Sequence, residues 1–361
     1  MSTQPFDSPD TFRAAFTQGL GGLLREDCGL GAYILVFNNA AFDAGLRAAL
    51  GPALAGRFAV FSAAFQEALK RGADPAEPPD DVAVFLRMMA VGYGGLAPVD
   101  LRRAGPWELQ FNPVRAFRPA RSAGERLTAL RRPFDPSTFH FNKPFLRLET
   151  FWSGNYEGRR LDFLVNKFPF VELQTIVVPD REAESPQFLT RADHDLAWSL
   201  TGAVGESMPG VVTGYNSLGA FASINHLHFH LTPRERPLPL MEPAWRHNGG
   251  SADYPIPCQV FDRCGPAWKE IDALQRRDQA FNLLYAPGRL YCLPRRHQGD
   301  YTLPGWCGGQ AWYELAGGFI CFDADRFQLL QADEIRATMA AAAMFSLNYS
   351  ESPGAHPVPA T

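Results

Sequence analysis

Histidine occurs at every second position of one short apolar segment, residues 224–232. The three histidines are His226, His228 and His230. Successive side chains of a β-strand point to opposite faces, so a strand here would place all three imidazoles on one side. The residues that alternate with them are Leu227, Phe229 and Leu231. These apolar side chains would face a core, and the segment therefore predicts a functional row of imidazoles on a buried strand.

Two chemistries use three imidazoles in this arrangement. In the first, one imidazole attacks a phosphoryl group, because neutral histidine is a good nucleophile near pH 7 when a carbonyl holds the proton of its other nitrogen. The flanking histidines then donate hydrogen bonds to non-bridging oxygens, where negative charge must be stabilised. In the second, the three imidazoles ligate a divalent transition metal such as Zn²⁺ with an open fourth position. The spacing alone does not choose between them.

Short polar side chains around the histidines favour phosphate. They offer hydroxyl and amide donors, together with a glycine that allows close approach of the backbone. The substrate-binding candidates among them are Asn216, Ser217, Gly219, Ser223 and Asn225. Arg115, which opens a basic run nearer the N-terminus, is a further candidate for contact with phosphate.

The segment Asn216–Leu231 resembles the histidine-triad (HIT-like) superfamily, and within it the branch of GDP-L-galactose and GDP-D-glucose phosphorylases. Other segments also have counterparts in that branch, so the resemblance covers about residues 107–346. They are Leu109–Arg115, Pro133–Lys143, Asn166–Pro169, and Asn282–Tyr285 with Leu293–Arg295. The resemblance implies an α+β fold of the galactose-1-phosphate uridylyltransferase type, in which antiparallel sheet is combined with helices.

The same resemblance implies roles for individual residues. The middle histidine of the motif is the nucleophile, which corresponds to His228, and His226 and His230 flank it. Three residues fall on phosphate-handling positions: Asn216, Ser223 and Asn225. Two residues fall on the strand beside the nucleotide: Asn166 and Lys167.

The implied reaction is nucleotidyl transfer in two steps that require no cofactor. His228 attacks the α-phosphorus of a nucleoside diphosphate sugar (GDP-hexose-like) or a dinucleoside polyphosphate, and inorganic phosphate then takes the nucleotidyl group. One alternative is a hydrolase that uses water, because His230 stands where the phosphorylase and transferase branches have glutamine. The other alternative is a metal-dependent enzyme with His226, His228 and His230 as ligands of a divalent transition metal.

Residues 1–106 predict a mainly helical N-terminal extension. Apolar residues recur with helical spacing in several segments, and Asp10 is the expected cap of the first. These segments are 11–24, 41–50, 58–70 and 82–91. The segment Gly31–Asn39 is compatible with either a buried strand or a helix.

From Trp107 onward the sequence predicts strands separated by Pro and Gly. We expect a first HIT-like half over 107–249, which carries the histidines, and a second, degenerate half over 250–361, because 281–293 faintly repeats 161–178. The expected strands are 161–165, 175–178, 211–215, 224–232, 281–285, 290–293 and 313–322. The expected helices are 191–207, capped by Thr190 with Asp193 as its partner, and one that Asp333 opens through Ala343.

Composition excludes several classes of protein. Hydrophobic residues make up 46% of the chain and charged residues 20%, as in ordinary globular proteins. A net charge of −4 gives no electrostatic case for nucleic-acid binding. No 18-residue window is uninterruptedly apolar, the first residues do not resemble a secretory signal, and the six cysteines contain no C-x-x-C pair. We therefore expect a reduced cytoplasmic protein that binds no membrane. Its expected partners are a small-molecule nucleotide and inorganic phosphate, and a homodimer is possible.

Overall fold

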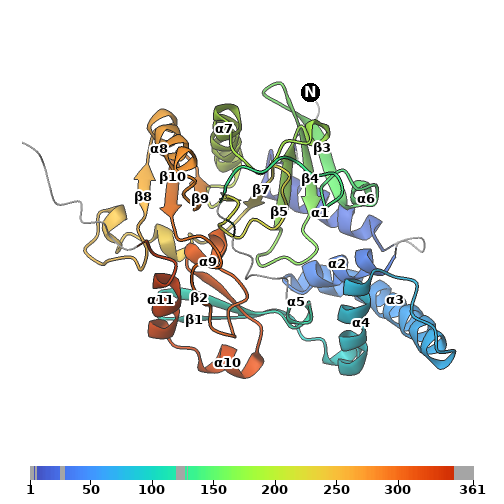
Figure 1. Cartoon of the computed structure of the whole chain (residues 1–361). Coiled ribbons are helices and arrows are strands. Elements are labelled where there is room, and N and C mark those ends of the chain that lie inside the picture. Colours follow the sequence, from blue (N-terminus) through green and yellow to red (C-terminus); the bar gives the residue numbers. More distant parts are fainter. Residues whose placement is uncertain (1–3, 5, 25–28, 119–126, 128, 345–361) are drawn as a thin grey trace, which may run out of the picture.

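The largest feature of the computed structural model is an eight-stranded sheet in which every neighbouring pair of strands is antiparallel (Figure 1). The structure describes residues 4, 6–24, 29–118, 127 and 129–344. The strand order is β3-β4-β5-β7-β6-β9-β10-β8. In chain order the strands are β3 (Thr150–Tyr156), β4 (Arg159–Val165), β5 (Thr175–Pro179), β6 (Val212–Asn216), β7 (Phe229–Thr232), β8 (Gln259–Phe261), β9 (Phe281–Ala286) and β10 (Arg289–Pro294).

Two helices pack side by side on this sheet. Helix α7 (Arg191–Ser207) contacts β6 and β9, and α8 (Cys264–Arg276) contacts β8 and β10. The α7 bounds and its capping box are as predicted, since the Thr190 N–H donates to Asp193 Oδ2 at 2.9 Å. The apolar residues that alternate with the histidines lie in the core between helices and sheet: Leu227, Phe229 and Leu231. The predicted burial of that half of the segment is confirmed.

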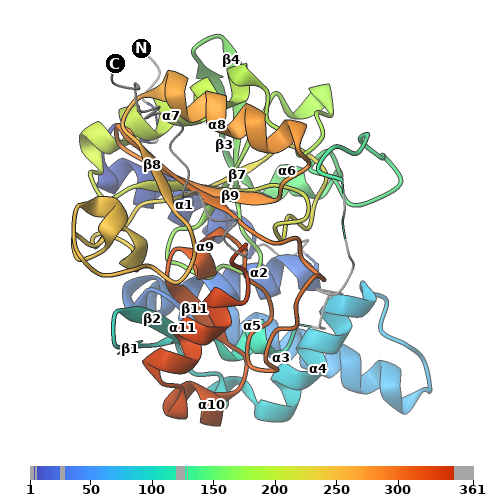
Figure 2. The same cartoon turned by 60° about the vertical axis from the view of Figure 1, so that its left-hand side comes forward.

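A smaller sheet joins the hairpin that follows the N-terminal helices to a strand near the C-terminus. The hairpin of β1 (Asp100–Ala104) and β2 (Trp107–Phe111) is extended by β11 (Gly318–Cys321), which runs parallel to β2. The short helix α9 (Trp312–Leu315) lies between the two sheets and contacts β6 and β9 (Figure 2). Helices α10 (Ala324–Leu329) and α11 (Ala332–Ala340) follow β11.

The N-terminal helices form a core of their own with the end of β4. They are α1 (Pro9–Gly22), α2 (Leu30–Ala40), α3 (Ala44–Lys70) and α4 (Pro79–Val91). Ser8 caps α1 in place of the predicted Asp10, because Pro9 already occupies the first helical position and Ser8 Oγ accepts from the Thr11 N–H at 3.1 Å. The ambiguous segment 31–39 is helical, and its apolar side chains are buried on more than one side.

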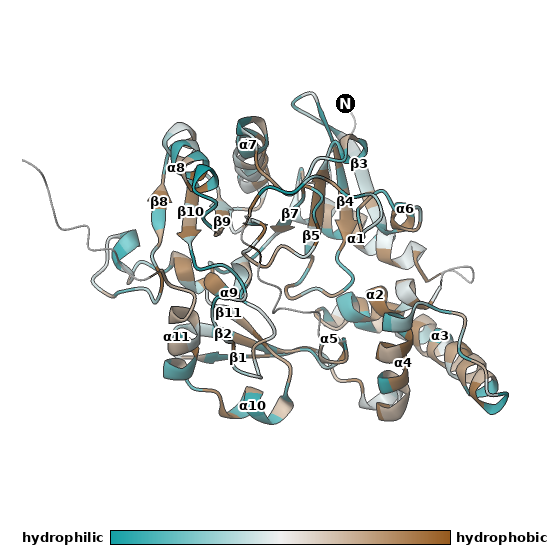
Figure 3. Cartoon of the chain, in the orientation of Figure 1, coloured by the Kyte–Doolittle hydropathy of each residue, from teal (hydrophilic) through white to brown (hydrophobic). Residues whose placement is uncertain are grey.

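Helix α3 replaces two predicted helices with one. The segment between them, 51–57, contains two glycines and Pro52, yet the helix continues through it and buries Leu54. Figure 3 shows α3 as a long apolar arm at the edge of the molecule. Within the described residues it is the one helix long and apolar enough to cross a membrane by length and composition. Its side chains Leu46, Leu54 and Phe65 are buried.

Two predicted strands are shorter than expected. Of the segment 224–232 only Phe229–Thr232 is strand, and the residues before it form a loop. The segment 313–322 divides into α9 and β11, because Glu314 Oε2 accepts from the Ala311 N–H at 2.9 Å and starts a helix there.

The remaining predicted strands are found within two residues of their expected ends, and the helix expected from Asp333 is α11. Two further short helices are α5 (Pro113–Ala116) and α6 (Leu146–Glu149).

The predicted divisions at residues 106 and 249 remain predictions. β1 and β2 pair across the first division, and β6 pairs with β9 across the second. The three parts therefore share their sheets. Residues 345–361, the end of the predicted second half, lie outside the described residues.

Gly214 of β6 is expected not to tolerate a methyl group. A Cβ there would lie 2.3 Å from the indole of Trp312, which is fully buried and cannot move freely. Overpacking of this kind costs about 1–3 kcal/mol, so Gly214→Ala should lower the urea midpoint of unfolding. Gly202 is the control, because it lies inside α7 and a Cβ there would have no atom within 4 Å. Gly202→Ala should stabilise by about 0.5–1 kcal/mol, and equal changes in the two variants would contradict the prediction.

Candidate active site

The three histidines lie where β7 begins. His230 is in β7, whereas His226 and His228 lie in the loop before it. The ring centroids of His228 and His230 are 5.2 Å apart, and the Phe141 ring lies 5.1 Å from His228 and 5.5 Å from His226. The imidazoles therefore form one row, as predicted, although only one of them is on a strand.

His228 presents an unprotonated Nε2. Its Nδ1 lies 2.7 Å from the carbonyl oxygen of His226. A carbonyl oxygen can only accept, so Nδ1 carries the ring proton and donates it. In the neutral imidazole Nε2 then holds a lone pair, and no group in the described part of the chain hydrogen-bonds to it. This is the tautomer that a nucleophile requires.

His226 carries its ring proton on the other nitrogen. Its Nδ1 accepts a hydrogen bond from the backbone N–H of Phe141 at 3.1 Å, so its proton is on Nε2. Nε2 is buried and forms no hydrogen bond of ordinary geometry among the described residues, although the Arg181 backbone lies close enough to act on the pKa of this imidazole. Because a buried N–H without a partner is costly, the oxygen of a bound ligand would be a favourable acceptor.

His230 also presents an N–H. The side-chain Nε2 of Gln174 lies 3.1 Å from its Nδ1, and the Oε1 of the same amide accepts from the Phe170 N–H at 3.0 Å. The Phe170 N–H can only donate, which fixes the orientation of the Gln174 amide and makes its Nε2 the donor to His230. The proton of His230 is therefore on Nε2.

The row is uncharged at neutral pH. Burial lowers the pKa of His226 to about 4, with a further contribution from His228, and burial lowers the pKa of His228 to about 4. Burial also lowers the pKa of His230 well below its ordinary value, and the charge of Arg115 acts in the same direction. The site thus presents the Nε2–H of His226 as a donor, the Nε2 lone pair of His228, and the Nε2–H of His230 as a second donor.

Asn216 also points a donor at this site. Its Oδ1 accepts from Asn282 Nδ2 at 2.7 Å and from the Trp312 N–H at 2.8 Å. Asn282 is held in turn by Arg295, whose Nη1 donates to Asn282 Oδ1 at 3.2 Å. With its oxygen occupied twice, Asn216 keeps its Nδ2 for a ligand, as expected of a phosphate-handling residue.

The other short polar candidates have different positions. Ser217 Oγ accepts from the Phe281 N–H at 3.0 Å and serves to join the loop to β9. Gly219 has φ +78°, and a Cβ there would lie 2.6 Å from His297 Nδ1, so this turn requires glycine. Ser223 is exposed. Asn225 Nδ2 donates to the Pro133 carbonyl at 2.8 Å and so holds the segment 133–143 against the histidines.

Arg115 lies close enough to His230 for its charge to act on the pKa of that imidazole, and its predicted role in binding substrate remains a prediction. Its guanidinium lies 5.5 Å from the centroid of the Phe170 ring, and Nη1 donates to the Phe168 carbonyl. Nε is buried and has no partner among the described residues. Burial lowers the pKa of Arg115 to about 10 and raises the pKa of neighbouring Glu314 to about 7. The sequence analysis did not single out Glu314.

Asn166 and Lys167 lie farther from the row. Lys167 Nζ is 2.6 Å from Asp81 Oδ1 of α4, and the Asn166 carbonyl accepts from Asn39 Nδ2 of α2 at 2.9 Å. No hydrogen bond or ring contact joins them to the three histidines in the part of the chain that the structure describes. Their predicted role in binding the nucleotide remains a prediction.

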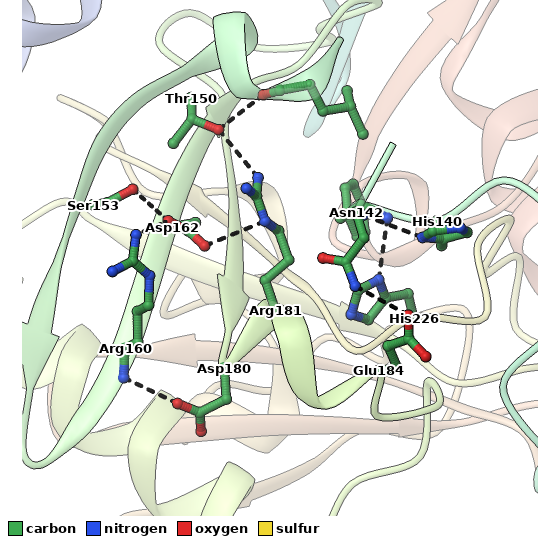
Figure 4. Close-up of polar contacts among 12 residues, drawn as sticks. His140, Asn142, Thr150, Ser153, Arg160, Asp162, Asp180, Arg181, Glu184 and His226 are labelled. Carbon is green, nitrogen blue, oxygen red and sulfur yellow. Dashed lines mark hydrogen bonds and ion pairs between the residues drawn. The ribbon is translucent and has the colours of Figure 1, made fainter. Parts of the chain in front are cut away.

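A polar network that includes His140, Asn142 and Arg181 borders His226 (Figure 4). The ring of His140 lies 6.4 Å from the ring of His226, and its Nδ1 accepts from the Asn142 N–H at 3.2 Å. Arg181 is paired with buried Asp162 at 3.4 Å, and the charge of Arg181 contributes to the lowered pKa of His226. The network thus brings the charge of Arg181 close to His226, and it includes the Glu184 carboxylate, which accepts from Asn142 Nδ2 at 3.3 Å.

The row does not fit a metal ion. A metal needs lone pairs on the ring nitrogens that face it, and only His228 offers one there. A change of tautomer at His226 or His230 would turn Nδ1 into a donor opposite a group that itself donates. The geometry therefore disfavours the three-histidine metal site.

A second cluster of metal-ligand residue types lies outside the row. It consists of His194, Asp195 and Cys264. Both ring nitrogens of His194 are already within hydrogen-bonding distance of Tyr285 Oη and the Cys264 carbonyl, and Arg191 pairs with Asp195 at 2.8 Å. Burial raises the pKa of the Cys264 thiol to about 12, which opposes formation of a thiolate ligand.

One family model matches the segment that contains the three histidines. Residues 107–232 match the family model described as GDPGP1-like, N-terminal domain. The matched segment contains β2 to β7, all three histidines and all of the predicted binding residues around them.

The curated relatives that the chain matches are named GDP-D-glucose phosphorylases. The chain is 32% identical over 106 residues to GDP-D-glucose phosphorylase 1 of Danio rerio, which is 29% of this chain and 30% of that protein. It is 28% identical over 156 residues to GDP-D-glucose phosphorylase 1 of Homo sapiens, which is 39% of this chain and 40% of that protein. The chain thus spans well under half the length of these relatives.

The fold is that of a solved phosphorylase. The crystal structure of yeast Ap4A phosphorylase Apa2 is similar with a TM-score of 0.50 and 13% sequence identity, and the match covers 77% of this chain and 98% of that one. This likeness shows the fold alone. The predicted α+β, HIT-like fold with antiparallel sheet and helices is confirmed.

Several functional residues were not predicted. Gln174, Phe141 and Asn282 orient the site side chains through hydrogen bonds that join distant parts of the sequence. Asn282 lies in a segment that the sequence analysis did connect with the phosphorylase branch, and that was the available signal. Gln174 directly precedes a predicted strand, but nothing in its spacing points to a histidine 56 residues away.

The imidazoles of the row should titrate far below ordinary histidines. Because burial favours the neutral form, His226 and His228 should remain uncharged from pH 8 to pH 5 and gain protons only near pH 4. A ¹⁵N titration of histidine side chains measures this and also reports the tautomers. The row should show Nε2–H, Nδ1–H and Nε2–H for His226, His228 and His230, respectively. A midpoint near 6.5 for His228, or an Nε2–H tautomer there, would contradict the assignment.

Proposed function

We propose that this protein is a nucleotidyltransferase of the phosphorylase type, which transfers a nucleotidyl group from its substrate to inorganic phosphate through His228. The observation that carries the proposal is the polarity of the row: one lone pair at His228 between two N–H donors at His226 and His230. A phosphoryl centre requires this combination, namely a nucleophile for phosphorus and donors for the two non-bridging oxygens.

In the first step His228 Nε2 attacks the α-phosphorus. The phosphorus–nitrogen bond forms, the bond from phosphorus to the bridging oxygen breaks, and sugar 1-phosphate leaves when the substrate is a nucleoside diphosphate sugar. His226 and His230 donate to the non-bridging oxygens, and Asn216 Nδ2 is a third donor. The imidazole ring gains positive charge in this step, and the bond from Nδ1–H to the His226 carbonyl stabilises that charge.

In the second step an oxygen of inorganic phosphate attacks the same phosphorus. The phosphorus–nitrogen bond breaks, nucleoside diphosphate leaves and His228 returns to its neutral tautomer. Arg115, with a buried Nε that has no partner in the described chain, supplies positive charge beside His230 for the anionic groups. The N–H of His230 serves here as the amide of a glutamine would, so histidine at this position is compatible with phosphate as the acceptor.

The choice of substrate rests on the relatives. The matched relatives are named GDP-D-glucose phosphorylases, which favours a GDP-hexose-like donor. The solved structure of similar fold is named for Ap4A, and a dinucleoside polyphosphate is the alternative donor. Both are small-molecule nucleotides, and both donors follow the same two steps at His228.

Product analysis tests the proposal directly. The protein is incubated with GDP-hexoses and with dinucleoside polyphosphates in phosphate buffer, and the products are separated by chromatography. Nucleoside diphosphate together with sugar 1-phosphate is the expected result. Nucleoside monophosphate without any diphosphate would show a hydrolase and overturn the choice of acceptor.

His228→Ala should abolish turnover while the protein stays folded, with a lowered thermal midpoint because the buried imidazole leaves a cavity. Loss of a catalytic nucleophile lowers kcat by at least about 10⁴-fold. His247→Ala is the matched control, because His247 is half-buried outside the row and its Nε2 lies 2.9 Å from the Leu240 carbonyl. Turnover by His228→Ala at the rate of the control would contradict the assignment of the nucleophile.

Activity should not depend on a bound transition metal. Since the row lacks the lone pairs for a metal site, dialysis against EDTA should leave the rate in phosphate buffer unchanged. Metal analysis of the purified protein before and after dialysis is the control for complete removal. A rate that falls on dialysis and returns with Zn²⁺ would favour the metal-dependent alternative.

A further inference from the structure

The ladder between β6 and β7 stops two pairs short of the nucleophile. Its register pairs Val212 with Thr232 and Gly214 with His230. If this antiparallel pairing continued by two residues on each strand, Asn216 would face His228. The strands instead separate after Gly214, and His228 belongs to no strand.

The side-chain amide of Gln187 fills this opening. Its Oε1 accepts from the His228 N–H at 2.9 Å, and its Nε2 donates to the Asn216 carbonyl at 3.0 Å and to the His228 carbonyl at 3.3 Å. The His228 N–H can only donate and the two carbonyls can only accept, so the orientation of the amide is unambiguous. One side chain thus satisfies three backbone groups that the ladder would otherwise pair.

The backbone of Gln187 is equally constrained. Its N–H donates to Asn225 Oδ1 at 3.0 Å, and its carbonyl accepts from the Tyr215 hydroxyl at 3.2 Å. The residue is 1% exposed and lies in the segment between β5 and α7. Every polar group of Gln187 is therefore used, and its neighbours include three predicted site residues: Asn216, Asn225 and His228.

We infer that Gln187 is the positioning residue of the nucleophile, and that it holds the β6–β7 ladder open so that Asn216 and His228 face the substrate together instead of pairing with each other. Paired main chains would bring Asn216 and His228 to ladder distance and change the direction of both side chains. The inserted amide keeps them apart by its own width and fixes the backbone from which the His228 ring extends. The inference rests on the proposed function for its effect on catalysis.

Replacement of Gln187 should lower kcat with little effect on KM. Gln187→Met keeps the volume of the side chain but removes all three hydrogen bonds, and a displaced nucleophile lowers the rate by about 10²-fold. KM for the nucleotide should change less than about threefold, because the donors of His226 and His230 remain. Gln275→Met is the matched control, since Gln275 is a buried glutamine whose Nε2 donates only to the Leu189 carbonyl, at 3.1 Å. Equal kcat in the two variants would overturn the inference.

A milder variant covers the case in which Gln187→Met does not fold. Tyr215→Phe removes only the hydroxyl that donates to the Gln187 carbonyl, and it should lower kcat by about fivefold, the effect of one hydrogen bond. A kcat equal to that of the unmodified protein would overturn the inference.

The state of the His228 ring gives a readout that needs no turnover. In the unmodified protein the ¹⁵N spectrum should show His228 protonated at Nδ1 alone, whereas Gln187→Met should show averaging between both tautomers and a pKa nearer the ordinary value. If the protein transfers no nucleotidyl group but this spectral difference appears, the proposed function fails and the positioning role stands. An unchanged tautomer and pKa in Gln187→Met would overturn the positioning role itself.

Discussion

The polarity of three hydrogen bonds at Nδ1 determines what this site can do. A carbonyl accepts from the ring of His228, whereas a backbone N–H and a primary amide donate to the rings of His226 and His230. None of these partners can exchange roles, because carbonyls do not donate and N–H groups do not accept. The ring protons are therefore fixed by the main chain and by Gln174, and the reactive edge of the row is fixed with them.

Burial makes these hydrogen bonds decisive. An exposed histidine would be partly protonated near pH 6.5 and would then have no free lone pair, whatever its neighbours. In the protein, desolvation removes that state from the physiological range. The same low-dielectric surroundings shift the pKa of Arg115 and Glu314 toward each other, so the charges beside the row depend on what binds there.

Local patterns predicted the elements well, and long-range contacts account for the errors. The capping box of Thr190 and Asp193 and the alternation around Phe229 are encoded within a few residues, and both were found where expected. The strand over 224–232 was overestimated because its N-terminal half is held by a glutamine from another part of the chain. No periodicity in the segment contains that information.

The candidate site shows the same division. The types and spacing of the histidines predicted a row of imidazoles, since that depends on the segment itself, whereas the choice of His228 as nucleophile came from the family resemblance and remains a prediction. Which nitrogen carries the proton of His226 and of His230 depends on Phe141 and Gln174, which lie 85 and 56 residues away from their partners. The proton positions that distinguish phosphoryl chemistry from metal binding therefore followed only from the three-dimensional structure.

The contacts of Asn166 and Lys167 attach the turn beside the site to the N-terminal helices. Asn39 of α2 and Asp81 of α4 hold this turn, and the same stretch of chain continues through Phe170 to Gln174. These contacts connect the N-terminal helices with Gln174, whose amide orients His230. The family match begins only at residue 107, so the turn that leads to Gln174 and His230 is held in part by helices that lie outside the matched segment.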